Sequence, residues 1–151
     1  MEYSENFIKL LIDGTLSSDI LREVQTSPKD EGRLNTIIKI EQGRMTWKEQ
    51  IILPLQENLF VVKKKGGDKI VKCKCGTEFG DYRKNWKDNA LVYQRETDEE
   101  LDEVHKGARR GNPDYNVLRE FYCPGCCVQL DVEVVPQGYP FVFNILPDLD
   151  D

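Results

Sequence analysis

Two stretches decide the fold of this chain, Cys73-Lys74-Cys75-Gly76 and Cys123-Pro124-Gly125-Cys126. Each lies where a predicted strand turns, so two tight turns can each supply two thiolates. Zinc prefers four such ligands at the corners of a tetrahedron, with metal–sulfur distances of about 2.3 Å. A glycine within or directly after each pair permits the tight backbone of such a turn. The sequence therefore predicts a zinc ribbon with the metal ligands Cys73, Cys75, Cys123 and Cys126.

The cysteine spacing departs from the common ribbon pattern in two respects. One residue rather than two separates the first pair, and the segment between the pairs exceeds the usual length of roughly 15 to 20 residues. An inserted helix at about residues 97–110 explains the longer segment. Cys127 stands where glycine is common; it could replace Cys126 as a ligand, and otherwise it is a partly buried free thiol. His105, the one histidine, is expected on the surface of the inserted helix.

Other chemistries fit the same cysteines less well. A redox-active dithiol at Cys123 and Cys126 needs a helix N-terminus to stabilise its thiolate, whereas strands flank this pair. Iron in a rubredoxin-like cage uses the same four ligands and stays an alternative to zinc. A catalytic zinc keeps one position open for water, and four thiolates fill the coordination sphere. We therefore expect a structural metal.

Motifs of catalysis and cofactor binding are missing from the sequence. It contains no phosphate-binding loop, no GxSxG nucleophile motif and no HExxH metalloprotease motif. The acidic runs near Asp98 and Asp148 are typical of solvated surface. We therefore expect no catalytic and no cofactor-binding residue in this chain.

The composition narrows the class of protein further. Of 151 residues, 39% are hydrophobic and 32% are charged, and the formal net charge is −6. This acidic balance argues against a general nucleic-acid binder, because affinity for phosphate depends on clustered Lys and Arg. No run of about 18 apolar residues could span a membrane, and the start of the chain, with Glu2 and Glu5, does not resemble a secretory signal. We therefore expect a cytoplasmic protein, in which thiols stay reduced and paired cysteines bind metal.

The first 47 residues have the pattern of short helices. Ser4 can cap a first helix, and Ser17 or Ser18 a second. Ser27 followed by Pro28 has the signature of a third helix start. The apolar stripes of these helices are narrow, so they pack either on a small core or on another chain.

The pattern changes to that of strands after Gln50. The predicted strands are 51–53, 59–62, 70–73, 117–122 and 128–135. A strong turn signal, Gly66-Gly67-Asp68, joins the second and third of them. In the last strand the alternation places Val128, Leu130, Val132 and Val134 on one face and Gln129, Asp131 and Glu133 on the other.

The elements together define an α+β fold. Short helices in residues 1–47 precede an antiparallel β zinc-ribbon domain in residues 48–135, and an extended tail covers residues 136–151. The helical insertion opens with a capping box at Thr97 and Glu100 and is expected to reach about Ala108. The tail carries aromatics between three prolines, a composition suited to lying along a partner or to folding back onto its own sheet.

Several segments outside the metal turns carry a family likeness. The segments outside the turns are Ser27-Pro28-Lys29-Asp30, Trp47 with Ile51-Ile52-Leu53-Pro54-Leu55, Asp81 and Asn85-Trp86-Lys87. The likeness also includes the turns themselves, in Cys73-Lys74-Cys75-Gly76 and Arg119-Glu120-Phe121-Tyr122-Cys123-Pro124. Together they resemble the small subunit of the acetone carboxylase and acetophenone carboxylase family. The likeness covers about residues 5–147. It is more specific than a zinc-ribbon match, because the helical lead-in and the Asn85-Trp86-Lys87 segment have no reason to recur in unrelated ribbons.

The resemblance implies a noncatalytic, zinc-bearing subunit of a biotin-independent, ATP-dependent ketone carboxylase. It maps the zinc ligands onto Cys73, Cys75, Cys123 and Cys126. Its large partner subunits resemble hydantoinase and 5-oxoprolinase subunits, and they would hold ATP with Mg or Mn. The chain ends soon after Pro147, earlier than the small subunits of the acetone enzymes, which favours acetophenone as the substrate. We expect the helical front and the tail to dock on the large subunits.

A second function of a different class stays open. The chain could be a free-standing zinc-ribbon adaptor that binds nucleic acid or a transcription partner. The basic run Lys63-Lys64-Lys65 is the feature that could contact phosphate. Co-purification with large subunits, against salt-sensitive retention of nucleic acid, separates the two functions.

Overall fold

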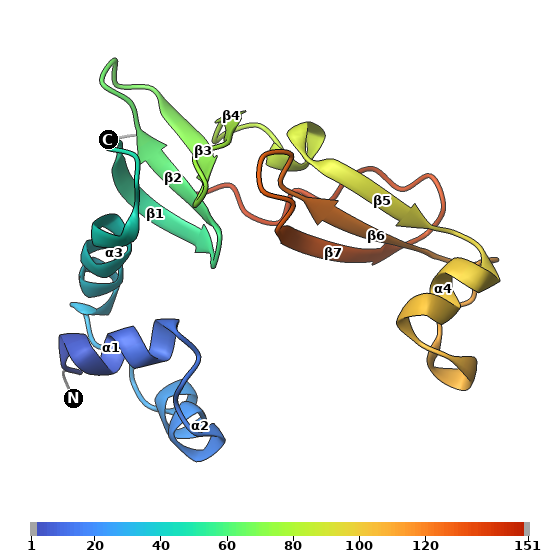
Figure 1. Ribbon diagram of the computed structural model, residues 1–151, viewed down its shortest axis with the longest axis horizontal. Helices are drawn as coiled ribbons and strands as arrows, with labels where there is room; N and C mark the ends of the chain where they lie inside the picture. The colour runs from blue at the N-terminus through green and yellow to red at the C-terminus, as the bar shows by residue number, and fades with distance from the viewer. Residues whose placement is uncertain (1–2, 150–151) are drawn as a thin grey trace.

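The computed structural model describes residues 3–149 and divides them between two lobes (Figure 1). The first lobe contains the helices α1 (Glu5–Ile12), α2 (Ser18–Thr26) and α3 (Arg33–Arg44), with a four-stranded antiparallel sheet. The second lobe contains a three-stranded antiparallel sheet and the helix α4 (Asp98–Val104). The α+β fold class predicted from the sequence is confirmed. No helix within residues 3–149 has the length and apolar character needed to cross a membrane.

The N-terminal helices begin at caps, and two of the three starts were predicted. Ser4 Oγ accepts a hydrogen bond from Phe7 N, and Ser17 Oγ accepts one from Ile20 N. The predicted third start at Ser27 is wrong. Ser27 Oγ donates to the Glu23 carbonyl at 2.7 Å and closes α2, so the next helix begins only after Gly32.

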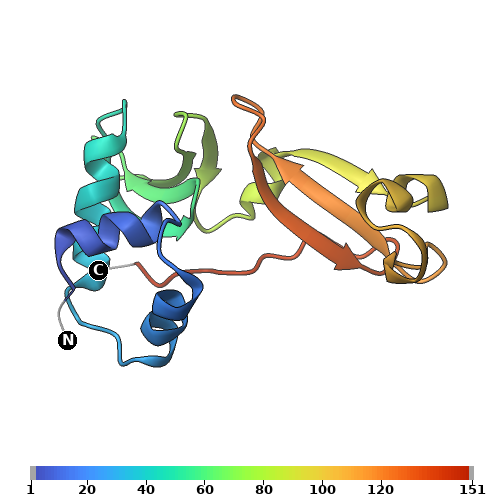
Figure 2. The same cartoon turned by 60° about the horizontal axis from the view of Figure 1, so that its bottom comes forward.

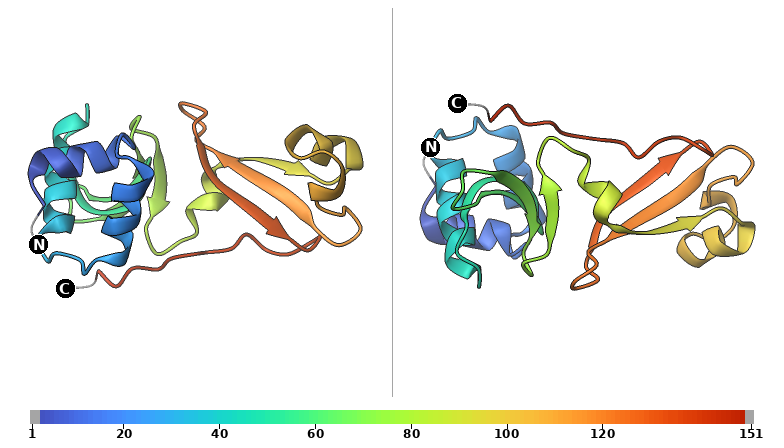
Figure 3. Two further views of the ribbon diagram at one scale, coloured as in Figure 1. Left: turned by 90° about the horizontal axis from the view of Figure 1, so that it is seen from below. Right: turned by 90° about the horizontal axis from the view of Figure 1, so that it is seen from above.

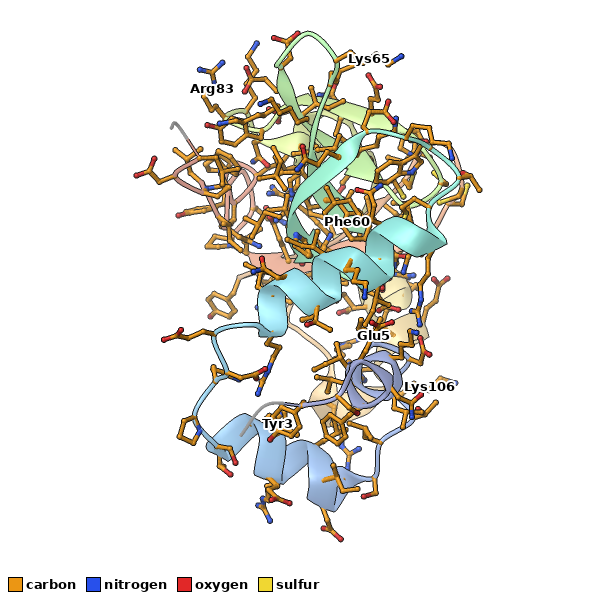
Figure 4. The ribbon with its side chains drawn as sticks, turned by 90° about the vertical axis from the view of Figure 1, so that its left-hand side faces the viewer. Tyr3, Glu5, Phe60, Lys65, Arg83 and Lys106 are labelled. Carbon is orange, nitrogen blue, oxygen red and sulfur yellow. The ribbon has the colours of Figure 1, made fainter. Side chains whose placement is uncertain are left out.

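The first sheet has the strand order β1-β2-β3-β4 and contains the predicted meander. Its strands are β1 (Gln50–Gln56), β2 (Leu59–Lys63), β3 (Lys69–Cys73) and β4 (Glu78–Asp81). The sequence did not predict β4, which is short and pairs with β3 across a register shift. The helix α3 covers one face of the sheet, where Ile38 and Met45 pack against a cluster that includes the buried Phe60 (Figure 4).

The second sheet has the order β5-β6-β7, with β5 (Leu91–Arg95), β6 (Val117–Tyr122) and β7 (Gln129–Val135). The strand β5 was not predicted. The predicted alternation in β7 is wrong, because Leu130 is buried while Val132 and Val134 are exposed. A bulge is the cause: Tyr122 pairs with Gln129 and Phe121 with Asp131, so Leu130 is an extra residue and the faces exchange after it.

The helical insertion begins as predicted and ends earlier. Thr97 and Glu100 form a complete capping box at the start of α4. The helix stops at Val104 rather than near Ala108, because His105 is already extended, and a 3₁₀ turn, η2 (Gly107–Arg109), follows. Leu101 is the buried residue of this helix. The insertion therefore adds about two turns of helix to the far end of the second lobe (Figure 1).

A shared core links the two lobes. It joins residues of the first sheet to residues around the second cysteine pair: Leu59, Val61, Val71, Cys73, Phe79, Tyr82, Cys123 and Leu130. A second 3₁₀ turn, η1 (Trp86–Asn89), connects the sheets. Trp86 contacts Phe79 and Phe121 edge-on, at ring-centroid distances of 5.9 and 6.2 Å. Phe79 and Tyr82 lie in the same buried cluster as Cys73, and Trp86 packs against it.

The C-terminal tail runs from the end of β7 back to the first lobe (Figures 2 and 3). Phe141 packs edge-on against Phe121 at 5.1 Å, and its carbonyl accepts a hydrogen bond from Asn85 Nδ2. Leu149 packs against the shared core, and its carbonyl accepts a hydrogen bond from Lys69 Nζ. The tail is extended, as predicted, and it lies on its own two sheets. Residues 150 and 151 of the predicted tail, like Glu2 at the other end, lie outside the described residues.

Candidate metal centre

The four predicted cysteine ligands come together, two from the end of β3 of the first sheet and the turn after it, and two from the turn after β6 of the second. Their Sγ atoms all lie within 4.8 Å of one another. Cys73 Sγ lies 3.9 Å from Cys126 Sγ, and Cys75 Sγ lies 3.6 Å from Cys123 Sγ. A tetrahedral site with metal–sulfur bonds of about 2.3 Å has sulfur–sulfur separations of about 3.8 Å. The cluster therefore has the dimensions of a four-thiolate site that could hold a metal ion such as zinc.

Each cysteine pair is held by a turn with corresponding backbone hydrogen bonds, and the turn of the second pair is one residue longer. Gly76 N donates to the Cys73 carbonyl at 2.8 Å, and Cys127 N donates to the Cys123 carbonyl at 2.8 Å. Each turn is closed by a strand-like bond, from Cys73 N to the Thr77 carbonyl and from Cys123 N to the Val128 carbonyl. The first cysteine of each pair is buried and the second is exposed. One-residue and two-residue spacings therefore produce equivalent pairs.

The two turns touch at Gly125. A Cβ placed there would lie 2.0 Å from Thr77 Oγ1 and 3.5 Å from Cys75 Sγ. No larger residue fits at position 125, because the Gly125 backbone lies too close to the Thr77 hydroxyl. Thr77 Oγ1 in turn lies 3.2 Å from Cys75 Sγ. Thr77 was not predicted from the sequence, and its position two residues after a ligand is the signal that could have indicated it.

Trp47 supports the first turn from outside. Its Nε1 donates to the Lys74 carbonyl at 3.1 Å, between the two cysteines of the pair. Its ring lies against Gly76, where an added Cβ would be 3.6 Å from Trp47 Cδ1. The Lys74 backbone N–H is also engaged, by the Asn58 carbonyl at 3.0 Å. The first pair is therefore fixed by the segment before β1 and by the β1–β2 turn.

The thiols of the cluster differ in how readily they ionise. Burial raises the pKa of Cys73 well above its ordinary value. Burial also raises the pKa of Cys75, but hydrogen bonds from the Thr77 side chain and backbone outweigh it and lower the pKa to about 6. Four adjacent thiolates repel one another unless a cation binds them, and metal binding displaces their protons. The donor set thus fits a divalent metal.

Cys127 and His105 lie outside the cluster. Cys127 is exposed and has a φ of 58°, a left-handed conformation that favours glycine. This conformation explains why glycine suits the position after the second pair. His105 is exposed at the C-cap of α4. Among the described residues, the cluster of possible metal ligands contains the four predicted cysteines alone.

Comparisons with known proteins agree with the resemblance seen in the sequence. Residues 45–151 match the family described as "Acetone carboxylase gamma subunit". The chain is 37% identical over 151 residues to the acetone carboxylase gamma subunit of Xanthobacter autotrophicus, a match covering 99% of this chain and 90% of the relative. It is 38% identical over 78 residues to the acetophenone carboxylase beta subunit of Aromatoleum aromaticum, covering 50% of this chain and 60% of the relative.

Proposed function

Because this chain belongs to the acetone carboxylase gamma subunit family, we propose that it is the zinc-bearing, noncatalytic subunit of a multisubunit, ATP-dependent, biotin-independent ketone carboxylase. The observation that carries the structural part of this proposal is the four-sulfur cluster between the lobes. Cys73, Cys75, Cys123 and Cys126 would hold the metal. With all four positions taken by thiolates, no position is left for substrate or water.

The place of the cluster in the fold supports a structural role for the metal. Cys73 ends β3 of the first sheet and Cys75 follows it, whereas Cys123 and Cys126 follow β6 of the second. A metal bound by all four joins the two sheets at one point. Because such a site does not exist in the unfolded chain, its binding free energy is folding free energy. Zinc would therefore fix the relative position of the two lobes.

The buried charges of the second lobe also support a noncatalytic role. Lys87 is fully buried, and its Nζ lies 2.5 Å from Glu133 Oε1 and 2.6 Å from Asp131 Oδ2. Glu133 Oε1 accepts a further hydrogen bond from Val142 N in the tail. Arg119 Nη1 lies 3.7 Å from Glu133 Oε2, so two cations balance the two carboxylates beneath the tail. We propose that larger subunits, of the hydantoinase and 5-oxoprolinase type, bind ATP with Mg or Mn and perform the carboxylation.

The most detailed part of the proposal is which ketone the enzyme carboxylates. The preference for acetophenone that we expected from the sequence is not shown by the comparisons. The match to the acetone carboxylase gamma subunit spans nearly the whole chain, whereas the acetophenone carboxylase match spans half of it. Acetone and acetophenone are therefore the two substrates to compare.

Purification of the tagged full chain with its partner subunits tests the proposal. We expect stoichiometric large subunits, about one zinc per chain, and ATP hydrolysis that depends on one of the two ketones. The isolated chain is the control and should neither hydrolyse ATP nor carboxylate. Turnover by the isolated chain, or purification without large subunits, would contradict the proposal.

The free-standing adaptor is the second candidate, and a basic hairpin is the observation that favours it. Lys48, Lys63 and Lys65 line a cleft of about 430 Å³ beside the β2–β3 turn, and Lys65 lies at its tip (Figure 4). Their neighbours Lys64 and Lys72 are already paired with Glu78 and Glu49, which reduces the charge available to phosphate. Retention of nucleic acid that is lost at high salt would favour this function.

A further inference from the structure

The two sheets present four edge strands, and three of them are protected against pairing with another chain. The strand β1 contains Pro54 and two register irregularities, and β4 has four residues and a register shift against β3. The strand β7 has a bulge and carries Asp131 and Glu133, which bind Asn144 and Val142 of the tail. Proline, bulges, short length and charges are the devices by which natural sheets prevent edge-to-edge association.

The strand β5 lacks proline, glycine and bulges. Its five residues, Leu91–Arg95, pair with β6 in unbroken register and include no proline or glycine. Leu91, Val92 and Tyr93 are 50%, 38% and 40% exposed. Within residues 3–149 no strand pairs with its outer edge, which lies along the border of the second sheet (Figure 1). A regular, apolar and uncovered edge strand is a template for strand addition.

Exposed apolar residues lie beside this edge on one face of the sheet, around the Arg95–Glu120 ion pair. The register places Leu91 and Tyr93 of β5 on the same face as Leu118 of β6 and Val134 of β7. Val132 and Val134 are 46% and 61% exposed. The opposite face carries Phe121 and Glu133, which η1 and the tail cover. The tail thus covers one face of the second sheet, and α4 contacts Arg95 at one end of the other face. The β5 edge and the exposed residues Leu91, Tyr93, Val132 and Val134 are left uncovered.

We propose that the outer edge of β5, with the exposed apolar residues beside it, binds an extended segment of a large subunit of the carboxylase, which adds to the sheet as a fourth strand. This inference rests on the proposed function for the existence of that subunit. It differs from the docking expected from the sequence, because the tail is already occupied by contacts within the chain.

The charges around β5 favour a partner subunit over a second copy of this chain. Acidic residues flank the strand at both ends, with Asp88 before it and Glu96, Asp98 and Glu99 after it. An antiparallel pair of two β5 strands would bring Asp88 of one copy toward Glu96 of the other, and each copy carries a formal charge of −6. The occupant that fits is an apolar strand with Lys or Arg beside the start of α4.

Lysines on β5 provide the most direct test, because lysine is a natural edge guard. The double variant Leu91→Lys/Tyr93→Lys should bind the large subunits at least tenfold more weakly in the co-expressed complex, with its zinc content unchanged. The control is Tyr115→Lys, since Tyr115 is 74% exposed in the loop before β6. It should assemble like the wild type. Full-strength assembly of the double variant would overturn the proposal.

Hydrogen exchange of the wild-type chain tests the same proposal without a substitution, so it can decide the question if the double variant misfolds. Amides of residues 91–95 should exchange at least tenfold more slowly in the complex than in the free chain, and unchanged exchange would overturn the proposal. A dimer of the free chain that the lysines abolish would also overturn it, in favour of a second copy. Protection of residues 91–95 in a complex without ketone-dependent ATP hydrolysis would contradict the proposed function and leave the docking surface standing.

Discussion

The two lobes differ in how their sheets are covered. The first sheet lies under α3 and has its own buried cluster of Ile51, Phe60, Val62 and Ile70. The second sheet has η1 and the tail on one face and exposed valines on the other. The first lobe can therefore be stabilised largely by packing, while the second depends on the metal, the tail and its buried ion pairs. A lobe as small as the second gains much from such additional links.

Removal of a metal ligand should show the largest difference in stability between the two lobes. We expect Cys123→Ser to lose the metal, to unfold the second lobe and to dissociate from its partners. Structural zinc can stabilise a small domain by about 10 kcal/mol, and most of that contribution should disappear. Metal content and amide exchange measure the effect. Cys73→Ser should have the same effect as Cys123→Ser. A metal-free variant that stays folded and assembled would contradict the structural role.

Loss of a buried charge should destabilise the second lobe less than loss of the metal, but more than the remaining changes. We expect Lys87→Met to cost about 3 to 5 kcal/mol, because Glu133 and Asp131 would be left without their buried cation. The matched variant in the first lobe is Lys64→Met, which removes an exposed ion pair with Glu78 and should change little. Chemical denaturation of the full chain compares them. Equal stability of the two variants would remove the contrast between the lobes.

The tail offers a smaller test of the same contrast. Phe141→Ala should cost about 2 kcal/mol or more, since Phe141 packs on Phe121 and lies over the Arg119 guanidinium. Phe143→Ala is the control, because Phe143 is exposed. The metal content of both should stay at the wild-type level, as it should after deletion of residues 136–151. If both substitutions shift the melting temperature equally, the tail does not cover the second sheet as described.

Cys127→Gly should have the smallest effect and the opposite sign. A left-handed φ of 58° disfavours every residue but glycine, so the substitution should stabilise the chain by about 1 kcal/mol. The metal should stay bound, since Cys127 lies outside the cluster. Thermal melting with metal analysis measures both properties. Loss of the metal in this variant would assign Cys127 as a ligand.

The sequence predicted the four-cysteine cluster better than it predicted the sheets. The cysteine turns were identifiable because their chemistry depends on local spacing and glycine. The edge strand β5 was missed because Leu91–Arg95 is short and exposed on both faces, so it has no apolar alternation. The bulge at Leu130 depends on pairing with β6, and no local pattern in β7 reveals it. The fold of the tail depends on contacts with Phe121 and the shared core, which lie far away in sequence.

X-ray absorption at the metal edge of the purified full complex tests the central claim most directly. We predict zinc bound by four sulfur atoms at about 2.3 Å, at one metal per copy of this chain, with the same spectrum before and after addition of ATP and ketone. Iron, a nitrogen or oxygen ligand, or a coordination shell that changes with substrate would contradict a structural four-cysteine zinc centre.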